Sequence, residues 1–140
     1  MNTTYKSNNN VVYSCKYHVV WCSKYRRKVL TNGVDQRLKE LLLEYAENLS
    51  VDILEMKIMP DYVQILVEVA PQFGIHKAVK SLKSCTSKIL REEFIHLRTK
   101  MPTLWTNSYF VSTVGSVSEE VIIQYIENQK TSQRQKDKMG

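Results

Sequence analysis

A tyrosine and a glutamine lie four residues apart near the end of the chain, in the stretch VIIQYIENQ from Val121 to Gln129. If this stretch is helical, Tyr125 and Gln129 share one face about a turn apart. A tyrosine phenol can act as a nucleophile, and a carboxamide oxygen is a hard donor that Mg²⁺ accepts. Spacing alone also fits a tyrosine that covers apolar neighbours, and by itself it favours that simpler interpretation.

A second group of polar residues lies in the stretch MPDYVQILVEV, from Met59 to Val69. Successive strand side chains point to opposite faces, so Tyr62, Gln64 and Glu68 share a mostly polar face. The opposite face is an apolar row of Val63, Ile65, Val67 and Val69. Polar side chains on a strand that looks central usually serve a site.

Hydrophobic periodicity predicts the elements that position these residues. Alternation predicts strands at 11–22, 51–59, 62–69 and 109–114. The Pro60-Asp61 turn makes the second and third strands an antiparallel pair. Apolar residues at helical spacing predict helices at 35–49 and 75–94. Ser116-Val-Ser-Glu119 has capping-box spacing for a last helix that reaches about Lys130.

The order of these elements predicts an α+β fold with a ferredoxin-like, split βαβ antiparallel sheet (β-α-β-β-α-β) and an added C-terminal helix carrying Tyr125. Two helices cover one face of such a sheet, and the last helix is available to cover the other. The first and third strands are central neighbours, so we expect the row Ser14, Lys16 and His18 to lie beside Tyr62, Gln64 and Glu68. We expect a polar N-terminal segment at 1–10, one domain at 11–130 and a polar, fraying tail at 131–140.

Composition restricts the class of protein. The chain has 140 residues and no apolar run near the ~20 residues that cross a bilayer. Its N-terminus lacks the apolar stretch of a signal peptide, so we expect a cytoplasmic protein without a membrane partner. Cys15, Cys22 and Cys85 show neither a disulfide nor a zinc spacing.

The charge of the chain favours a polyanionic partner. Twenty Lys and Arg against 14 Asp and Glu give a net charge of +6, and basic side chains that neutralise phosphates gain free energy by releasing counterions. Two basic groups are candidates for DNA binding, although half of them could be an ordinary solvated face: Lys24, Tyr25, Arg26, Arg27 and Lys28 after the first strand, and Lys77, Lys80, Lys83 and Lys88 on the second helix.

Four stretches together resemble one known family: CKYHVVWCSKYRRKVL, PQFGIHKAVKSLK, MPTLWTNSYFVSTVG and VIIQYIENQ. They are similar to the single-tyrosine transposases of the insertion sequence 200/605 family, in the HUH superfamily of single-strand nucleases. The resemblance covers about 11–129. It implies a homodimer with the fold deduced above, which binds hairpins in single-stranded DNA at transposon ends.

The resemblance also implies roles for particular residues. Tyr125 matches the nucleophile that forms a 5′-phosphotyrosyl intermediate, and Gln129 matches a ligand of a divalent Mg²⁺ or Mn²⁺ ion. In the dimers of this family, each tyrosine helix can complete the site of its partner. The family's other two ligands are histidines of a His-hydrophobe-His strand motif, but this chain has Tyr62 and Gln64 at those positions.

This departure leaves two main hypotheses open. Gln64 could still offer a carbonyl oxygen, whereas the neutral phenol of Tyr62 is a feeble ligand; Asp61, Glu68 and His18 are possible substitutes. The chain is then either a functional transposase or a catalytically silent hairpin-binding protein that is decayed, domesticated or engineered. An RNA-binding regulator on the same sheet is a third, weaker alternative, because the aromatic RNP1 pattern is missing. We expect a protein that binds DNA and cuts it poorly or not at all.

Overall fold

The computed structural model describes residues 6–8, 11–115 and 118–139. Its helices are α1 (Val34–Asn48), α2 (Ile75–Glu93), α3 (Ile95–Thr99) and α4 (Glu119–Met139), with a short 3₁₀ turn η1 (Lys24–Arg26). Its strands are β1 (Lys6–Asn8), β2 (Val11–Tyr13), β3 (Lys16–Cys22), β4 (Val51–Met59), β5 (Tyr62–Val69) and β6 (Phe110–Thr113). No helix among these residues is both long and apolar enough to cross a membrane.

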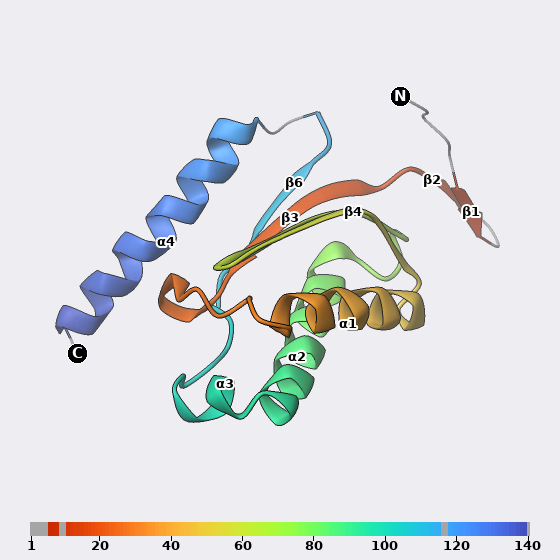
Figure 1. Ribbon diagram of the computed structural model, residues 1–140. Coiled ribbons are helices and arrows are strands. Elements are labelled where there is room, and N and C mark those ends of the chain that lie inside the picture. Colours follow the sequence, from red (N-terminus) through yellow and green to blue (C-terminus); the bar gives the residue numbers. More distant parts are fainter. Residues whose placement is uncertain (1–5, 9–10, 116–117, 140) are drawn as a thin grey trace.

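Four antiparallel strands form the sheet, in the order β4-β5-β3-β6, and this confirms the predicted α+β fold. Helices α1 and α2 lie on one side of the sheet and α4 lies on the other (Figure 1). The split βαβ connection makes β3 and β5 central neighbours, as the order of elements predicted. Residues at the middle of this sheet are therefore held by ladder hydrogen bonds on both sides.

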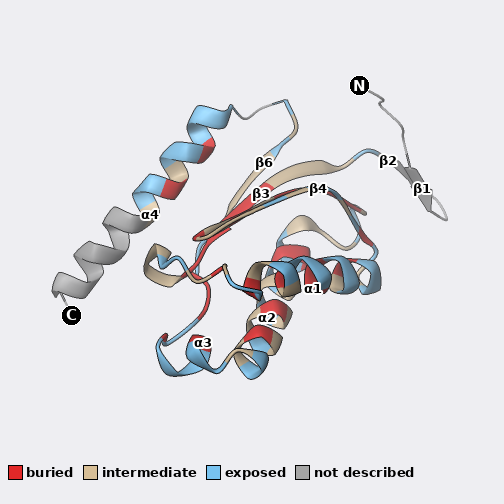
Figure 2. Cartoon of the chain, in the orientation of Figure 1, coloured by how far each residue is buried: buried red, intermediate tan, exposed pale blue. Residues whose placement is uncertain are grey.

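The main core lies between the sheet and the two covering helices. Helix α1 buries one stripe at helical spacing, namely Val34, Leu38, Leu41, Leu42 and Ala46, and the odd positions of β5 from Val63 to Val69 are also buried. Red buried stretches accordingly run along the inner sides of these elements (Figure 2). Burial of this kind contributes about 25 cal/mol per Å² of apolar surface, which holds the sheet rigid beneath any site on its other face.

A second, smaller cluster lies on the opposite face of the sheet. Val20 and Cys22 of β3 pack against Ile122 and Ile126 of α4, and Tyr62, Phe110 and Tyr125 pack around them. The apolar side of α4 therefore covers one end of the face that the two other helices leave open.

The register of β3 and β5 corrects one prediction. Lys16 does lie opposite Glu68, but His18 lies opposite Leu66, so it does not directly face Tyr62 or Gln64. The strand neighbour of Gln64 is Val20, and that of Tyr62 is Cys22. Antiparallel pairing reverses the order of residues on the second strand, so the two polar rows are offset, and His18 and Gln64 are diagonal neighbours that line one cavity.

Several element boundaries also differ from the predictions. The strand predicted at 11–22 is interrupted at Ser14 and Cys15, and its first part, β2, pairs with β1, which lies in the segment predicted only as polar. Helix α3 was not predicted, and α4 continues beyond Lys130 to Met139. Ser116 of the predicted capping box lies outside the described residues; Ser118 Oγ accepts a hydrogen bond from the Val121 N–H at 3.4 Å.

Candidate functional site

A hydrogen-bonded triad of side chains brings Tyr125 and Gln129 together. Ser108 Oγ donates to Gln129 Oε1 at 2.8 Å and lies 2.8 Å from the Tyr125 hydroxyl. Either hydroxyl group can be the donor in the contact between Ser108 and Tyr125. The two helix residues therefore share a face, and one loop serine connects them.

The environment of Tyr125 keeps its phenol neutral. Its ring packs on Phe110 with 5.6 Å between centroids. Burial raises the pKa of Tyr125 to about 12, despite the opposing hydrogen bond from Ser108. A phenolate forms less readily here than on a free tyrosine, since burial disfavours the charged form. Any reaction at this oxygen needs a group that removes its proton or neutralises its charge.

Lys83 fixes the loop that supplies Ser108. Its ammonium donates to the carbonyl oxygens of Thr106 at 2.6 Å and Ser108 at 3.1 Å. Its Nζ also lies 5.4 Å from the centre of the Tyr109 ring. Burial lowers the pKa of Lys83 to about 8. Lys83 was predicted on the outer face of the helix among residues that contact DNA, but it is half-buried and turned toward the loop.

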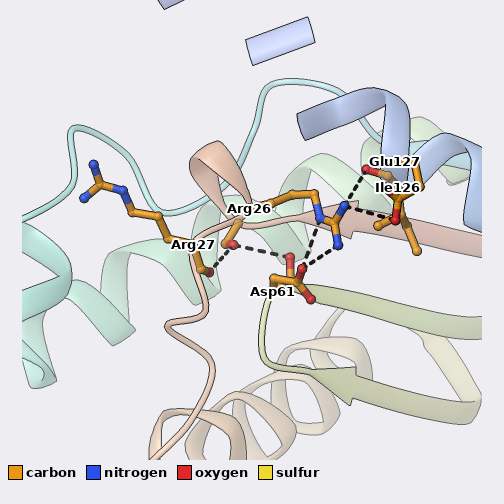
Figure 3. A network of polar contacts seen from close by, with 6 residues as sticks. Arg26, Arg27, Asp61, Ile126 and Glu127 are labelled. Carbon is orange, nitrogen blue, oxygen red and sulfur yellow. Dashed lines mark hydrogen bonds and ion pairs between the residues drawn. The ribbon is translucent and has the colours of Figure 1, made fainter. Parts of the chain in front are cut away.

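Arg26 fastens α4 to the sheet (Figure 3). Its Nε and Nη2 donate to Asp61 Oδ2 at 3.0 and 2.7 Å. Its Nη1 donates to the Ile126 carbonyl oxygen at 3.4 Å and lies 3.5 Å from Glu127 Oε1. This side chain, predicted to contact DNA, therefore joins the basic loop, the β4–β5 turn and the tyrosine helix.

Arg26 reaches this position through an unusual backbone. Tyr25 and Arg26 have φ angles of 60° and 51°, which non-glycine residues seldom adopt in succession. Ser23 holds the loop in place, because its Oγ donates to the Arg27 carbonyl at 2.6 Å and to the Asp61 carbonyl at 3.3 Å. Such strain persists only where surrounding contacts enforce it.

Tyr62 and Gln64 share one face of β5 but have different surroundings. The Tyr62 ring joins the apolar cluster that contains Tyr125. Gln64 lines a cavity of about 440 Å³ together with His18, Glu55 and Lys57. The phenol therefore lies near the proposed nucleophile, whereas the amide opens toward the uncovered part of the sheet.

These donors do not fit a divalent metal ion. Tyr62, Gln64 and Gln129 offer only neutral oxygens, while Mg²⁺ and Mn²⁺ favour carboxylate ligands. Within residues 6–8, 11–115 and 118–139, no group of three or more His, Cys, Asp or Glu could hold a metal ion. The possible substitute Asp61 is already bound by Arg26, Glu68 is buried opposite Lys16, and His18 lies opposite Leu66.

The remaining basic residues that were predicted to contact DNA lie in two places. Lys77, Lys80 and Lys88 are exposed on α2, and Arg27 and Lys28 are exposed after η1. Tyr25 is flanked by Lys24 Nζ at 5.1 Å and Arg27 Cζ at 5.6 Å from its ring centre. Arg27 also donates to the Lys100 carbonyl at 3.0 Å. Contact of these residues with DNA stays a prediction.

One residue of the site and one pairing of side chains were not foreseen from the sequence. Ser108 lies in the stretch TNSYF, where a hydroxyl just before a predicted strand was the sole signal. The pairing of Arg26 with Asp61 joins residues 35 positions apart and has no periodic signature. Both depend on how the loops cross the end of the sheet.

This fold and its helix-borne tyrosine define a class, the single-tyrosine transposases, and comparison with known proteins agrees. The family model described as "Transposase IS200 like" matches residues 11–129. The chain therefore belongs to the IS200-like transposase family.

Individual relatives cover most of the chain. It is 34% identical to the ISDra2 transposase TnpA of Deinococcus radiodurans over 126 residues, covering 89% of this chain and 90% of that protein. It is 31% identical to the transposase for insertion sequence element IS200 of Salmonella typhimurium over 137 residues, covering 96% and 87%.

Solved structures share the fold. A Deinococcus radiodurans R1 structure ascribed to a transposase has a TM-score of 0.83 and 36% identity, covering 89% of this chain and 97% of the other. A REP-associated tyrosine transposase bound to a REP hairpin has a TM-score of 0.56 and 8% identity, covering 80% and 63%. At that identity, the second likeness concerns the fold alone.

Proposed function

We propose that this protein is a homodimer that binds hairpins in single-stranded DNA at transposon ends and that its strand cleavage is impaired. The observation that carries this proposal is the contrast between the residues around α4, which match the family, and those of β5, which do not. Tyr125, Ser108 and Gln129 form a connected group, while the two positions of β5 that hold histidines in the family pattern are Tyr62 and Gln64 here. The family relationship and the net charge of +6 support the DNA partner.

Hairpin recognition rests on the basic surfaces and the relatives. Exposed lysines along α2 and the cations around Tyr25 can contact phosphates, which position a nucleic acid without reading its sequence. The REP-associated transposase with the same fold is bound to a hairpin, which agrees with this type of partner.

Impaired cleavage follows from the chemistry of the donors. In the family reaction the Tyr125 oxygen would form a bond to phosphorus while the bond from phosphorus to the 3′ oxygen breaks, and the 3′ hydroxyl takes up a proton. The pKa of Tyr125 near 12 leaves little phenolate at neutral pH. Three neutral oxygen donors offer little to hold the cation that would compensate the developing charge.

A functional transposase is the second candidate. The observation that favours it is the connected Tyr125, Ser108 and Gln129 group, in which both helix residues are already positioned by 2.8 Å hydrogen bonds. Weak activity in high Mn²⁺ would fit this candidate.

A covalent-adduct assay separates the two. The protein is incubated with a labelled end hairpin carrying flanking single strand and with Mg²⁺ or Mn²⁺, then analysed on a denaturing gel. We expect little or no adduct from this chain and a clear adduct from the Tyr62→His/Gln64→His double variant, which restores the strand motif.

The Tyr125→Phe substitution is the control in both backgrounds and must abolish any adduct. A strong Tyr125-dependent adduct from the unmodified chain would contradict impaired cleavage. Hairpin binding measured in the same samples shows whether a missing adduct reflects lost binding instead. Equal affinity for an RNA hairpin of the same sequence would favour the RNA-binding alternative.

A further inference from the structure

A small pocket lies between α2 and the loop that leads into β6. Its volume is about 270 Å³, near the lower end of the roughly 300–1,000 Å³ of small-ligand sites. Its lining comes from α2 and the loop, namely Lys80, Lys83, Ser84, Ser87, Thr103, Trp105, Thr106, Asn107 and Tyr109. The size suits a single small unit rather than a folded segment.

The polar lining of this pocket favours an anion. Two of its residues are lysines, five carry hydroxyl groups, and none is acidic. An ammonium group has three N–H donors, and two of those on Lys83 go to the carbonyls of Thr106 and Ser108. Across the described part of the chain, no carboxylate forms an ion pair with Lys83. A phosphate group could accept its remaining N–H and face Lys80 as well.

The other side of the pocket suits a nucleobase. Tyr109 is half-exposed and is held in place by His76, whose Nδ1 lies 2.5 Å from the Tyr109 hydroxyl. Asn107 is exposed beside it and offers both a donor and an acceptor. An aromatic ring that stacks on a base and an amide that meets its edge are the groups with which proteins hold unpaired bases.

The pocket shares its loop with Tyr125. Asn107 and Tyr109 line the pocket, while Ser108 between them hydrogen-bonds Tyr125 and Gln129. Lys83 connects the pocket to the Tyr125 group, because it lines the pocket and donates a hydrogen bond to the Ser108 carbonyl. A strand that enters the pocket would therefore pass close to the tyrosine.

We infer that this pocket holds one nucleotide of the single strand that flanks the hairpin, with its phosphate against Lys80 and Lys83 and its base against Tyr109 and Asn107. The inference rests on the proposed DNA-binding function and adds a subsite for unpaired DNA. Trp105 closes the inner wall, because it is buried with its Nε1 bonded to Thr86 Oγ1 at 3.1 Å.

The test compares three fluorescent DNA probes by anisotropy: a blunt hairpin, the same hairpin with an unpaired extension, and an unstructured thymidine oligonucleotide. The variant Lys80→Ala/Asn107→Ala removes two exposed pocket groups and leaves Lys83 to hold the loop. Lys39→Ala is the matched control, since it removes an exposed lysine from α1, away from the pocket.

We expect the extension to raise the affinity of the full-length protein by about tenfold, in line with one stacked base. The double variant should lose most of that gain relative to its own affinity for the blunt hairpin, which falls only by the loss of the Lys80 phosphate contact. Lys39→Ala should keep both affinities. A 5-iodo-deoxyuridine in the extension should also photo-crosslink to Tyr109.

Failure of the pocket and failure of the function give different results. If the extension raises the affinity equally in the double variant and in Lys39→Ala, the pocket is not the subsite, while the proposed hairpin binding stands. If no hairpin binds but the oligonucleotide binds in a Lys80-dependent way, the hairpin proposal fails and the subsite stands. Absence of binding to all three probes overturns both.

Discussion

At the scale of residues, the site depends on hydrogen bonds that no pattern along the chain reveals. Ser108 connects Tyr125 to Gln129 from the loop that leads into β6. The hydrogen bond from Ser108 fixes the phenol and lowers its pKa, but burial raises that pKa by more. The tyrosine is thus well placed but poorly ionised.

This balance predicts how Tyr125 titrates. In ¹³C-tyrosine NMR, one ring should titrate near pH 12 and its signal should be missing in Tyr125→Phe. Ser108→Ala should raise the pKa of Tyr125 further, because it removes a hydrogen bond that favours the phenolate. A Tyr125 pKa at or below the ordinary value of about 10 would contradict the buried environment.

The same shift has a consequence for stability. The folded pKa of Tyr125 is above its unfolded value, so the unfolded chain binds fewer protons between about pH 10 and pH 12. The contribution is fully present below pH 10 and is lost as the pH rises toward 12. Urea unfolding should show a steeper alkaline loss for the unmodified chain than for Tyr125→Phe.

At the scale of elements, the position of α4 is set by one guanidinium group and two isoleucines. Ile122 and Ile126 bury the apolar side of the helix against β3. Arg26 then connects the helix to the β4–β5 turn, because it donates to the Ile126 carbonyl and to the Asp61 carboxylate. The hydrophobic contact is non-directional, whereas the forked hydrogen bonds specify an angle.

Loss of this connection should destabilise the protein. Arg26→Ala leaves the Asp61 carboxylate buried without its cation, and we expect a loss of about 2–3 kcal/mol in the free energy of unfolding. The measurement is urea unfolding followed by circular dichroism.

The exposed pair of Arg37 and Glu93 is a matched control for this prediction. It also pairs through Nε and Nη2, which donate to the two Glu93 carboxylate oxygens at 2.8 and 2.9 Å, but it is more exposed to solvent. Exposed pairs contribute less because water screens them, so Arg37→Ala should cost less than Arg26→Ala. Equal losses would show that the burial of Arg26 is not what matters.

At the scale of the whole molecule, charge and family membership point to one kind of partner. The excess of basic residues is spread over α2 and the loop after β3, on a chain with a net charge of +6. Such a distribution attracts a polyanion from all directions and orients it over the surface.

Hairpin affinity should therefore depend on salt. A plot of log K against log salt concentration should be linear, with a slope of about −0.9 for each phosphate neutralised on a duplex stem. Anisotropy titrations over a range of salt concentrations measure this slope, and Lys77→Ala should make it shallower by about one contact. A slope of zero would exclude the basic surfaces as the DNA contact.

Much of the architecture could be predicted because it depends on local periodicity. Alternation in Val63 to Val69 and the helical spacing of Leu38, Leu41 and Leu42 define which faces are buried. The element order then leaves few topologies, so the central pairing of β3 with β5 followed. Helix α3, strand β1 and the far end of α4 were missed because they lack a strong apolar pattern.

The sequence by itself determined the class of this protein: its fold, its helix-borne Tyr125 and Gln129, and the presence of Tyr62 and Gln64 on the strand after the Pro60-Asp61 turn. The tertiary structure alone decided the contacts of each side chain. It turned Arg26 and Lys83 from expected DNA contacts into anchors of a helix and a loop, and it brought Ser108 to the tyrosine. The physical reason is that side-chain hydrogen bonds between distant segments depend on register and loop path, which leave no periodic trace in the chain.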